Sequence, residues 1–520
     1  MNSDPTTVAQ VLRGRREYGD KPLLICDDER LSYADADARS AALAASLLTL
    51  GVGKGTHVGL LYPNGAEFVV AMLAASRIGA VVVPFSTFST APELLRQLAD
   101  AEVAIMLAAR SFRSHDFAVR LAEALSLPAG TQGPIFTTAA PVLRHVLFTG
   151  DAAPGDVSLV RPMEDDVDGS DVLSVIYTSG SMSIPKGVVH THAALMAHQR
   201  ELNRIRGLTA ADRLFCNSPF FWIGGFAFGL LATLVAGATL ICSNASDAGA
   251  TLDLLEAEKP TITNGFVATI AHLTRHPSFP GRDLSSMRRG NLYPIMAPEA
   301  RPVDSELRHS MLGMTEAGSV VLISSDETDQ PETRRGSFGF LAPGFEARLI
   351  HPEGGDDVAP DEVGELLIRG PALMQHYYGR TREECFDADG WFHTGDLLRR
   401  DGDGVFYFAG RAGAMIKTAG ANVAPSEVET ALTPLVRAVD ESAIVYVVGL
   451  PDPERGQIVA AAIATDTGEL FDTGALRRSA VAQLSAYKLP RRWLVLQHDA
   501  VPMLSAGKLD LPALRKLFDA

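Results

Sequence analysis

Residues 177–187 read YTSGSMSIPKG, and the interpretation of the chain starts from this stretch. The four residues before it, LSVI at 173–176, form a short apolar run that predicts a buried strand. Small residues let a backbone approach a ligand closely. Hydroxyls, free N–H groups and a lysine such as Lys186 bind phosphate oxygens. A helix is expected at 193–203, so a strand, a small hydroxylated loop and a lysine together predict a polyphosphate-binding loop.

Length and charge restrict the class of protein. At 520 residues the chain is too long for one core and predicts several domains. A formal charge of −16 argues against nucleic-acid binding, which depends on basic patches. Cys26, Cys216, Cys242 and Cys385 lack metal-ligand spacing and are interpreted as reduced core thiols. With a polar start that lacks a signal-peptide pattern, they predict a cytoplasmic protein.

Residues 222–242 carry no charge over 21 residues, which is long enough for a membrane span. Four glycines interrupt the stretch, and Gly237 falls where a helix would end before the strand pattern ATLI at 238–241. A buried helix followed by a strand is therefore favoured over a membrane span.

Helix and strand patterns alternate before the phosphate loop. This order predicts parallel strands joined by crossover helices. Residues 109–166 look less regular and are predicted to form a surface connection, and a second α/β series is expected at 214–325. The predicted helices before the loop are 31–53, 67–78 and 92–99, and the predicted strands are 57–61, 80–83 and 103–107.

The phosphate loop resembles the signature YTSG(S/T)TGxPKGV of the adenylate-forming superfamily, which contains acyl-CoA synthetases, peptide-synthetase adenylation domains and luciferases. It lacks the Gly-Lys-Ser/Thr of the P-loop. Met182 and Ser183 replace the usual Thr-Gly. The resemblance implies that ATP is bound by Thr178, Ser179, Gly180, Ser181 and Lys186, with Thr178 also taking part in catalysis.

Residues 313–316, GMTE, match a second motif of this superfamily. In the superfamily the glutamate helps to hold Mg²⁺, which prefers oxygen ligands and offsets charge on the leaving pyrophosphate. The match implies a catalytic, metal-binding Glu316 and a nucleotide site that includes Gly313, Met314 and Thr315. Leu312 stands where relatives place an adenine-stacking tyrosine, and RGNLYP at 289–294 replaces the usual Gly-Gly-Ala loop.

Two further motifs resemble the superfamily in the second part of the chain. HTGD at 393–396, followed by Gly410-Arg411, implies that Asp396 and Arg411 bind the ribose and that Phe408 lies in the nucleotide site. PMLSAGK at 502–508 implies that Lys508 is the catalytic lysine, because a cation suits the charge that develops at the α-phosphate. Gly413 occupies the place of the superfamily hinge.

The superfamily resemblance covers nearly the whole chain and implies an α/β fold. We expect a large N-terminal α/β domain of stacked sheets with helices at 1–410, which binds ATP and the acid. A small, mobile α+β C-terminal domain at 411–520 would carry the catalytic lysine.

The acid pocket is predicted from SPFFWIGGF at 218–226. Peptide-synthetase domains place an aspartate near position 222 to pair with the substrate amine, and Trp222 cannot do so. The acid is therefore predicted to be no α-amino acid and to have an apolar or aromatic body, although simple core packing of the aromatic residues stays an alternative. The predicted pocket residues are Phe221, Trp222, Gly224, Gly225, Asn264, Gly265 and Phe266.

The resemblance implies a two-step acyl-CoA ligase that uses ATP, Mg²⁺ and coenzyme A. The acid is first converted to an acyl-adenylate, and the acyl group is then transferred to the CoA thiol. One alternative is delivery to a carrier-protein phosphopantetheine arm or to an amine. Another is a nucleotide- or acyl-binding homologue with weakened catalysis. Monomer and homodimer are both left open.

Overall fold

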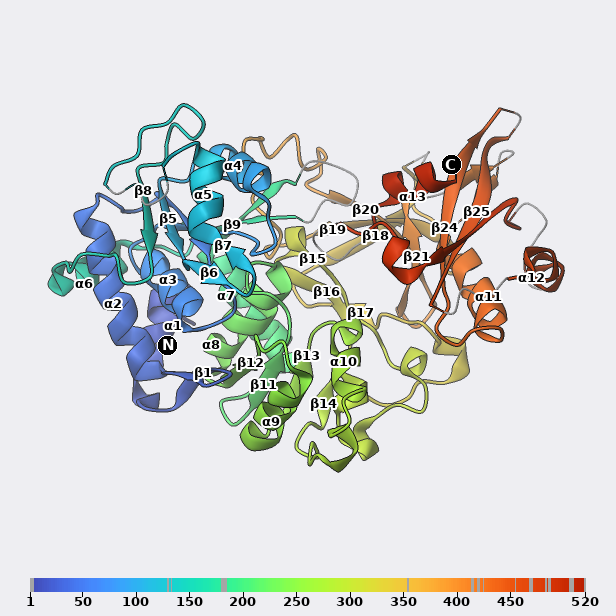
Figure 1. Cartoon of the computed structure of the whole chain (residues 1–520), viewed down its shortest axis with the longest axis horizontal. Helices are drawn as coiled ribbons and strands as arrows, with labels where there is room; N and C mark the ends of the chain where they lie inside the picture. The colour runs from blue at the N-terminus through green and yellow to red at the C-terminus, as the bar shows by residue number, and fades with distance from the viewer. Residues whose placement is uncertain are drawn as a thin grey trace. The chain divides into compact units, whose positions relative to one another are not determined.

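The computed structural model divides into two compact units (Figure 1). Unit 1 contains the chain up to Thr178, Lys186–Phe345 and Arg369–Cys385, and unit 2 contains Glu346–Ile368 and the chain from Phe386 on. The structure describes residues 4–128, 131, 133–178, 185–352, 355–412, 416–418, 421–423, 425–453, 455–466, 471–481, 484, 488–504 and 509–518, without the side chains of residues 268, 269, 417, 421 and 422.

The first sheet of unit 1 has the strand order β10-β9-β4-β3-β5-β8. Its strands pair in parallel except for the antiparallel pair of β9 and β10, so the parallel α/β arrangement predicted before the phosphate loop is confirmed. The strands are β3 (His57–Leu61), β4 (Val81–Pro84), β5 (Ile105–Ala108), β8 (His145–Phe148), β9 (Val172–Tyr177) and β10 (Gly187–Thr191).

The prediction of an irregular surface connection at 109–166 is wrong. The segment contains strand β8 of the first sheet and helix α5 (Phe117–Leu125), in which Phe117, Leu121 and Leu125 are buried. Its Gly, Pro and Asp clusters obscured the apolar face of this short helix. The segment also contains β6 (Ser111–Phe112), β7 (His115–Asp116) and α6 (Val160–Asp166).

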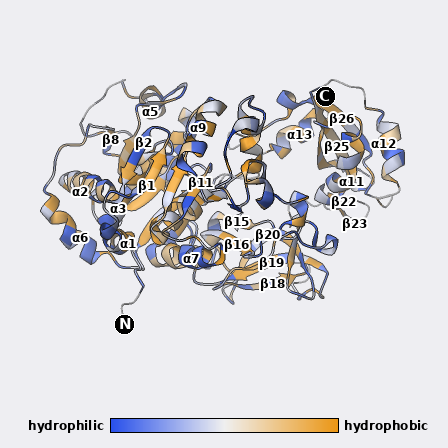
Figure 2. Ribbon diagram, turned by 90° about the horizontal axis from the view of Figure 1, so that it is seen from below, coloured by the Kyte–Doolittle hydropathy of each residue, from blue (hydrophilic) through white to orange (hydrophobic). Residues whose placement is uncertain are grey.

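The second sheet of unit 1 has the order β14-β13-β11-β12-β1-β2, and only its edge strand β2 is antiparallel. Parallel sheets covered on both faces have apolar strands, and Figure 2 shows β1 and β11 as hydrophobic ribbons. The strands are β1 (Pro22–Cys26), β2 (Glu29–Ser32), β11 (Arg213–Cys216), β12 (Thr239–Cys242), β13 (Ile262–Asn264) and β14 (Arg289–Gly290).

Helices α2 (Tyr33–Thr49) and α3 (Ala66–Arg77) fill the layer between the two sheets. One core cluster joins Leu24 of β1 and Leu60 of β3 to Met72 of α3, and Glu67 is the one residue of α3 that is not buried. Successive residues of a strand face opposite sides of a sheet. Ile25, next to Leu24, accordingly belongs to a different cluster on the far side of the second sheet.

The outer faces of both sheets are also covered. Helices α4 (Ala91–Asp100) and α5 lie side by side over the first sheet, as Figure 1 shows. Helices α9 (Ala248–Glu258) and α10 (Ala271–Thr274) cover the second sheet. The stacked sheets with helices that were predicted for the N-terminal part are therefore present in unit 1, whose chain begins with helix α1 (Val8–Gly14).

Residues 222–242 form a buried helix and strand, as expected. They contain the π-helix η3 (Gly224–Leu231), helix α8 (Ala232–Ala236) and strand β12. Gly237 ends α8 with φ +72°, a backbone angle that glycine adopts without strain. Over the described residues, no helix is long and apolar enough to cross a membrane.

A small sheet, β15 (Leu312–Met314), β16 (Ser319–Ile323) and β17 (Phe340–Leu341), completes unit 1. Helix α7 (His192–Ile205) follows β10, and its Thr191 cap accepts a hydrogen bond from Ala194 N at 3.3 Å. Gln199 of α7 donates from Nε2 to Gly318 O and Ser319 Oγ, both at 3.1 Å, and so ties the helix to this small sheet.

Unit 2 contains two sheets, and the first ends at Arg411. Its order is β18 (Glu346–Ile350), β19 (Val363–Arg369), β20 (Phe392–Arg400) and β21 (Phe406–Arg411). The second sheet contains β22 (Ile416–Thr418), β23 (Ala421–Val423), β24 (Ile444–Asp452), β25 (Gly456–Thr465) and β26 (Arg492–Gln497), with helices α11 (Pro425–Arg437), α12 (Thr473–Ala480) and α13 (Leu511–Leu517) in the same part of the chain.

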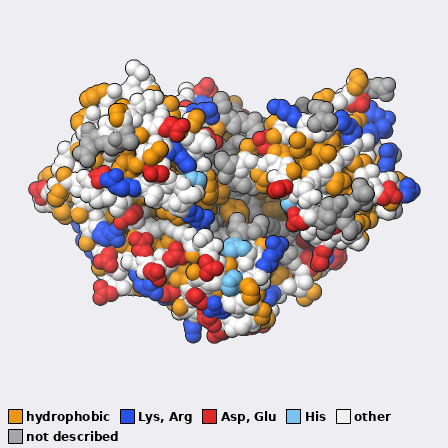
Figure 3. Space-filling model, in the orientation of Figure 1, with side chains coloured by type: hydrophobic (Ala, Val, Ile, Leu, Met, Phe, Trp, Pro, Cys, Tyr) orange, Lys and Arg blue, Asp and Glu red, His pale blue; other side chains and the backbone are white. Residues whose placement is uncertain are grey.

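The surface carries charges of both signs. On the face that Figure 3 presents, acidic and basic side chains are interspersed.

Candidate active site

Thr178 and Lys186 close the two ends of the predicted phosphate loop. Tyr177 and Gly187 are antiparallel partners on β9 and β10. Beyond them, Thr178 N donates to Lys186 O at 3.0 Å, and Lys186 N donates to Thr178 Oγ1 at 3.2 Å. The loop therefore begins and ends at fixed points. Its remaining predicted residues, Ser179, Gly180, Ser181, Met182 and Ser183, lie outside the described residues.

Tyr377 brings the lysine of the phosphate loop and the glutamate of the GMTE motif together. Lys186 Nζ lies 4.7 Å from the centre of the Tyr377 ring, and the Tyr377 hydroxyl donates to Glu316 Oε1 at 2.7 Å. Burial, together with the charge of Glu316, raises the pKa of Tyr377, so this hydroxyl stays protonated and can only donate to the carboxylate.

Backbone pairing holds Tyr377 in place. Gln375 N donates to Val189 O at 2.8 Å, and Tyr378 N donates to Gly187 O at 2.7 Å, so this segment runs along β10. The sequence analysis did not identify Tyr377. Its signal was the Tyr-Tyr pair in an otherwise polar connection, which has no phosphate-binding chemistry of its own.

The GMTE motif is supported by a buried histidine. Strand β15 leads into the 3-10 turn η9 (Thr315–Ala317), and His190 Nε2 lies 2.7 Å from Thr315 O. Because a carbonyl only accepts, Nε2 carries the proton. Burial lowers the pKa of His190 to about 4, so the ring is neutral at physiological pH. Met374 N donates to Glu316 O at 2.8 Å and fixes the backbone of the motif.

The other residues of this motif are accessible. Gly313 is exposed, and Leu312, Met314, Thr315 and Glu316 are half-buried. A Cβ at Gly313 would lie 2.8 Å from Ser319 O, so the close pairing of β15 with β16 requires glycine there.

Asp396 and Arg411 are neighbours in unit 2. They are register partners on β20 and β21, and Arg411 Nε lies 2.7 Å from Asp396 Oδ1. Asp396 N donates to Thr394 Oγ1 at 3.0 Å, and Gly395 forms the corner with φ +70°. The predicted ribose pair is thus one ion pair on adjacent strands, and Phe408 is half-buried on β21.

Two predicted residues of unit 2 lie outside the residues that the structure describes. Lys508 lies in the undescribed stretch 505–508, which is flanked by the bridge between Met503 and Leu509 and by a hydrogen bond from Asp510 N to Pro502 O at 2.9 Å. The predicted hinge Gly413 also lies outside the described residues.

An aromatic cluster in unit 1 contains three of the predicted pocket residues. The rings of Phe221 and Trp222 meet edge-on at 5.4 Å, and those of Trp222 and Phe266 at 6.2 Å. Phe88 adds an edge-on contact with Phe221 at 5.7 Å. Phe266 is 51% exposed and Phe221 is buried, so the cluster extends from the core to the surface.

The predicted pocket glycines differ in their surroundings. A Cβ on Gly224 would meet its nearest neighbour, Ser218 Oγ, only at 3.9 Å, so this glycine borders open space. A Cβ on Gly225 would lie 2.0 Å from Pro219 O, and one on Gly265 would lie 1.6 Å from Asn217 Oδ1. Gly225 is therefore required by its close approach to the backbone of Pro219, and Gly265 by its φ of +149° and its contact with the Asn217 side chain.

A cavity opens where β13 and β14 end, and its lining includes Asn264 and Gly290. Ligands of open α/β sheets bind at the carboxyl ends of parallel strands. Asn291 supports this edge, since its Oδ1 accepts from Gly265 N at 3.1 Å and its Nδ2 donates to Gly265 O at 2.8 Å. The loop that replaces the usual Gly-Gly-Ala therefore forms hydrogen bonds with the backbone of Gly265 in the predicted pocket. The cavity is also lined by Arg206 and Phe228, which the sequence analysis missed.

Preformed metal sites are absent from the described residues. In that part of the chain, no group of three or more His, Cys, Asp or Glu side chains could hold a metal ion. The four cysteines are free thiols, and Cys26, Cys216 and Cys242 are buried. A magnesium ion at Glu316 would accordingly need oxygens of a bound substrate or water as its other ligands, which is how Mg²⁺ is commonly held beside phosphates.

Comparisons with known proteins show the family of the chain. A family model described as "AMP-binding enzyme" matches residues 12–378. Feruloyl-CoA synthase of Amycolatopsis sp is 31% identical over 94% of this chain and 94% of its own. Indoleacetate–CoA ligase of Aromatoleum aromaticum is 30% identical over 94% of this chain and 93% of its own. The chain belongs to the AMP-binding enzyme family.

Solved structures share the fold at lower identity. The anthranilate CoA ligase AuaEII in complex with anthranoyl-AMP is 23% identical, has a TM-score of 0.78, and is matched over 98% of this chain and 97% of its own. The amide bond synthetase McbA from Marinactinospora thermotolerans is 24% identical, with a TM-score of 0.79 over 98% of this chain and 100% of its own. The predicted fold class, α/β with a separate C-terminal part, is confirmed.

Proposed function

We propose that this protein activates a carboxylic acid other than an α-amino acid with ATP and transfers the acyl group to coenzyme A. The family membership supports this function, and so do the CoA ligases among the relatives. The observation that carries the proposal is that Tyr377 contacts both Lys186, at the end of the phosphate loop, and Glu316 of the GMTE motif.

The first step needs positioning and charge neutralisation more than a protein nucleophile. A carboxylate oxygen of the acid attacks the α-phosphorus of ATP and forms the acyl-adenylate, while the bond to the β-phosphate breaks and pyrophosphate leaves. Lys186 and the hydroxyl of Thr178, at the two ends of the loop, would bind phosphate oxygens together with Ser179, Gly180 and Ser181. Gly313, Met314 and Thr315 would line the nucleotide, and Leu312 would cover the adenine.

Glu316 would hold Mg²⁺, which neutralises charge on the leaving pyrophosphate when it is bound. The Tyr377 hydroxyl donates to Oε1 of Glu316, and no hydrogen bond from a described residue engages Oε2, which would therefore act as the oxygen ligand. The same hydrogen bond fixes the orientation of the carboxylate beside Lys186.

In unit 2 we propose that Asp396 accepts from the ribose hydroxyls, that Arg411 orients this carboxylate, and that Phe408 contacts the nucleotide. Lys508 is proposed to neutralise the α-phosphate, with 1–410 as the adenylation domain and 411–520 as a mobile domain that turns about Gly413. Such a rotation would separate the two half-reactions, as conformational steps do in other enzymes whose domains close over a substrate.

In the second step the CoA thiol loses its proton and its sulfur attacks the acyl carbon, so that AMP leaves and a thioester forms. The aromatic cluster of Phe221, Trp222 and Phe266 would hold the body of the acid. Trp222 offers no carboxylate for a substrate amine, which supports an acid without an α-amino group.

The test is acid-dependent exchange of labelled pyrophosphate into ATP over a panel of fatty, aromatic and alicyclic acids. We expect exchange with at least one acid. Glu316→Gln should lower it about a hundredfold, and Tyr377→Phe about tenfold, because one charge-assisted hydrogen bond is lost. Tyr378→Phe is the matched control, since its hydroxyl binds Glu102 instead, and it should stay close to wild type.

No exchange with any acid would contradict the function and favour a homologue that only binds nucleotide or acyl groups. Thioester formation is then checked by mass spectrometry with CoA, a phosphopantetheinylated carrier protein and an amine offered separately. Product with the carrier protein or the amine but not with CoA would contradict the proposed acceptor.

A further inference from the structure

Arg206 lines the cavity at the ends of β13 and β14, and no described acidic residue forms an ion pair with it. The residue caps the C-terminal end of α7, where the helix dipole favours a cation. Its side chain stacks on Phe228, with the guanidinium carbon 3.9 Å from the ring centre. Asn264, a predicted pocket residue, lines the same cavity.

Only part of the hydrogen-bonding capacity of Arg206 is used by the described residues. Nη2 donates to Asn203 Oδ1 at 3.0 Å and to Phe228 O at 2.9 Å. Nε and Nη1 are buried and have no hydrogen-bond partner within the described part of the chain. Since an arginine has five N–H donors, three of them remain available. Unpaired buried donors are costly and rarely kept without a ligand.

The acidic residues of the cavity are occupied elsewhere. Asp326 accepts from Thr328 Oγ1 at 2.6 Å and from Gln330 Nε2 at 2.8 Å, and these bonds lower its pKa to about 2. Glu327 Oε1 accepts from Gly290 N at 3.3 Å. Burial raises the pKa of Glu327, although the charges of Arg289 and Arg308 act in the opposite direction. None of the described ion pairs includes Arg206. Burial lowers the pKa of Arg206 to about 9, so it remains a cation at neutral pH.

We infer that Arg206 binds a second carboxylate, carried at the far end of the acid that the enzyme activates. The stack on Phe228 and the hydrogen bonds of Nη2 hold the guanidinium in one orientation, and the free N–H groups of Nε and Nη1 offer charge-assisted hydrogen bonds to such a group. The reacting carboxylate is adenylated as proposed above, so this inference rests on the proposed function and adds the class of acid: a dicarboxylic acid with an apolar body.

The experiment compares acids of equal chain length: a dicarboxylic acid, its monomethyl ester, and the monocarboxylic acid that ends in a methyl group. Adenylation is followed by pyrophosphate release. For the wild type we expect kcat/KM for the diacid to exceed that for both neutral-ended acids at least tenfold. Arg206→Met should remove this preference, while activity with the monocarboxylic acid changes by less than threefold.

Two further variants separate recognition from structure. Arg206→Lys keeps the cation and should keep part of the preference. Arg204→Met removes an arginine of the same helix that is exposed and paired with Glu201, and it should keep the full preference. An Arg206→Met enzyme that loses activity equally with all acids, or that still prefers the diacid, would overturn the inference.

Equilibrium dialysis with the radiolabelled diacid in the absence of ATP separates this inference from the proposed function. We expect binding to the wild type at least tenfold tighter than to Arg206→Met. Equal binding to both would overturn the subsite. Tight, Arg206-dependent binding with no pyrophosphate release from any acid would support the subsite and contradict the proposed activity.

Discussion

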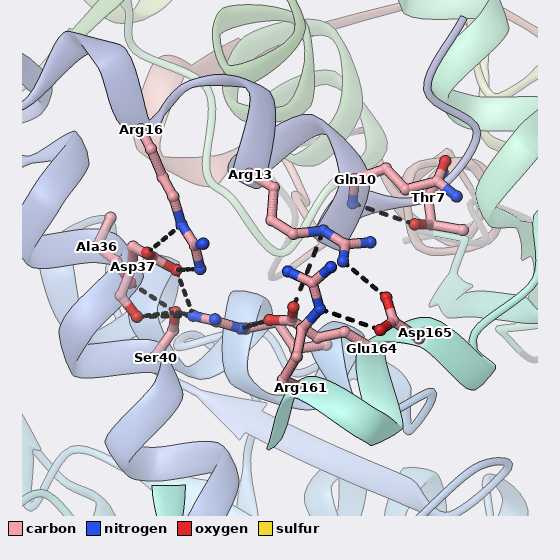
Figure 4. Close-up of polar contacts among 11 residues, drawn as sticks. Thr7, Gln10, Arg13, Arg16, Ala36, Asp37, Ser40, Arg161, Glu164 and Asp165 are labelled. Atoms are coloured by element: carbon pink, nitrogen blue, oxygen red, sulfur yellow. Dashed lines mark hydrogen bonds and ion pairs between the residues drawn. The ribbon is translucent and has the colours of Figure 1, made fainter. Parts of the chain in front are cut away.

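Arg77, which is buried, and Arg206, which is half-buried with a buried Nε and Nη1, place a cation inside unit 1 in opposite ways. Arg77, at the end of α3, is 3% exposed, and its Nε lies 2.5 Å from Oε1 of the equally buried Glu164. Its Nη1 lies 2.9 Å from Asp37 Oδ1 and donates to Ser40 Oγ at 2.8 Å. Figure 4 shows Asp37 and Ser40 on one side of this cluster and Glu164 on the other, with Arg13 and Arg16 nearby. Arg206, by contrast, lines a cavity and has no carboxylate partner among the described residues.

The difference separates a structural cation from one suited to binding. A fully paired buried charge ties together the elements that supply its partners, and here those are α2, α3 and α6. A buried charge with unused donors beside a cavity gains stability only when a ligand supplies the missing acceptor. The two arginines should therefore respond differently to the same substitution.

The largest effect is expected for Arg77→Met. Glu164 would stay buried and lose its hydrogen-bonded cation, with only Arg13 left at 3.9 Å, whereas the half-buried Asp37 keeps its pair with Arg16. Breaking a buried pair such as Arg77–Glu164 costs about 3–5 kcal/mol of unfolding free energy. Denaturant unfolding followed by circular dichroism measures the loss. A loss below about 1 kcal/mol would mean that the cluster is hydrated and not structural.

The double variant Arg77→Met with Glu164→Met tests whether the unpaired carboxylate causes the loss of stability. Replacing both charges by apolar side chains removes the unpaired carboxylate, and such replacements are often neutral. We expect the double variant to recover at least half of the stability lost in the single variant. A double variant less stable than either single variant would contradict the assignment of the cost to an unpaired charge.

Buried histidines on α7, the helix that ends at Arg206, should give a pH dependence. Burial lowers the pKa of His192 and of His198 to about 4 each, below the value of about 6.5 in an unfolded chain. Between these values the unfolded state binds more protons, so stability is fully present above pH 6.5 and decreases as the pH falls towards 4, by up to about 1.4 kcal/mol per pH unit for each histidine.

Urea unfolding at pH 7.5, 6 and 5 tests this prediction, and His198→Phe should reduce the slope. Stability that rises as the pH falls through this range would contradict the neutral, buried state of these rings.

Gly290→Ala tests the edge of the cavity. Gly290 has φ +105°, and an added Cβ would lie 1.9 Å from Thr263 O. We expect a loss of about 1–3 kcal/mol, typical of backbone strain, together with altered acid selectivity. Gly281→Ala is the control, because no atom lies within 4 Å of its added Cβ, and its thermal midpoint should match the wild type.

Arg206→Met should have the smallest effect on stability. The variant removes buried N–H groups that lack partners among the described residues, and this gain offsets the loss of the two Nη2 hydrogen bonds, so unfolding free energy should change by less than about 1 kcal/mol. A loss as large as that of Arg77→Met would show that Arg206 is structural, and the contrast between the two arginines would fail.

Much of the fold could be predicted from sequence because its signals are local. Ser32 marks the start of α2, where its side chain accepts from Asp35 N, and Gly237 marks the end of α8. Strand β3 has the predicted bounds. Helix α5 was missed because its apolar face covers less than three turns and irregular segments surround it.

Only the site residues that belong to sequence motifs could be predicted. Thr178, Lys186, Glu316 and Asp396 stand in recognisable patterns, and their placement relates Lys186 to Glu316 within unit 1. Tyr377 and Arg206 act through contacts with residues far away in the chain, which no local pattern reports. No sequence motif includes Arg206, and its stack on Phe228 is visible only in the structure.

The proposed chemistry is tested most directly by the stoichiometry of products with ATP, CoA and an accepted acid. We predict that chromatography and mass spectrometry will find one AMP, one pyrophosphate and one acyl-CoA for each acid consumed. Formation of ADP and inorganic phosphate, or release of AMP without a thioester, would contradict the proposal that the acid is activated as an adenylate and passed to coenzyme A.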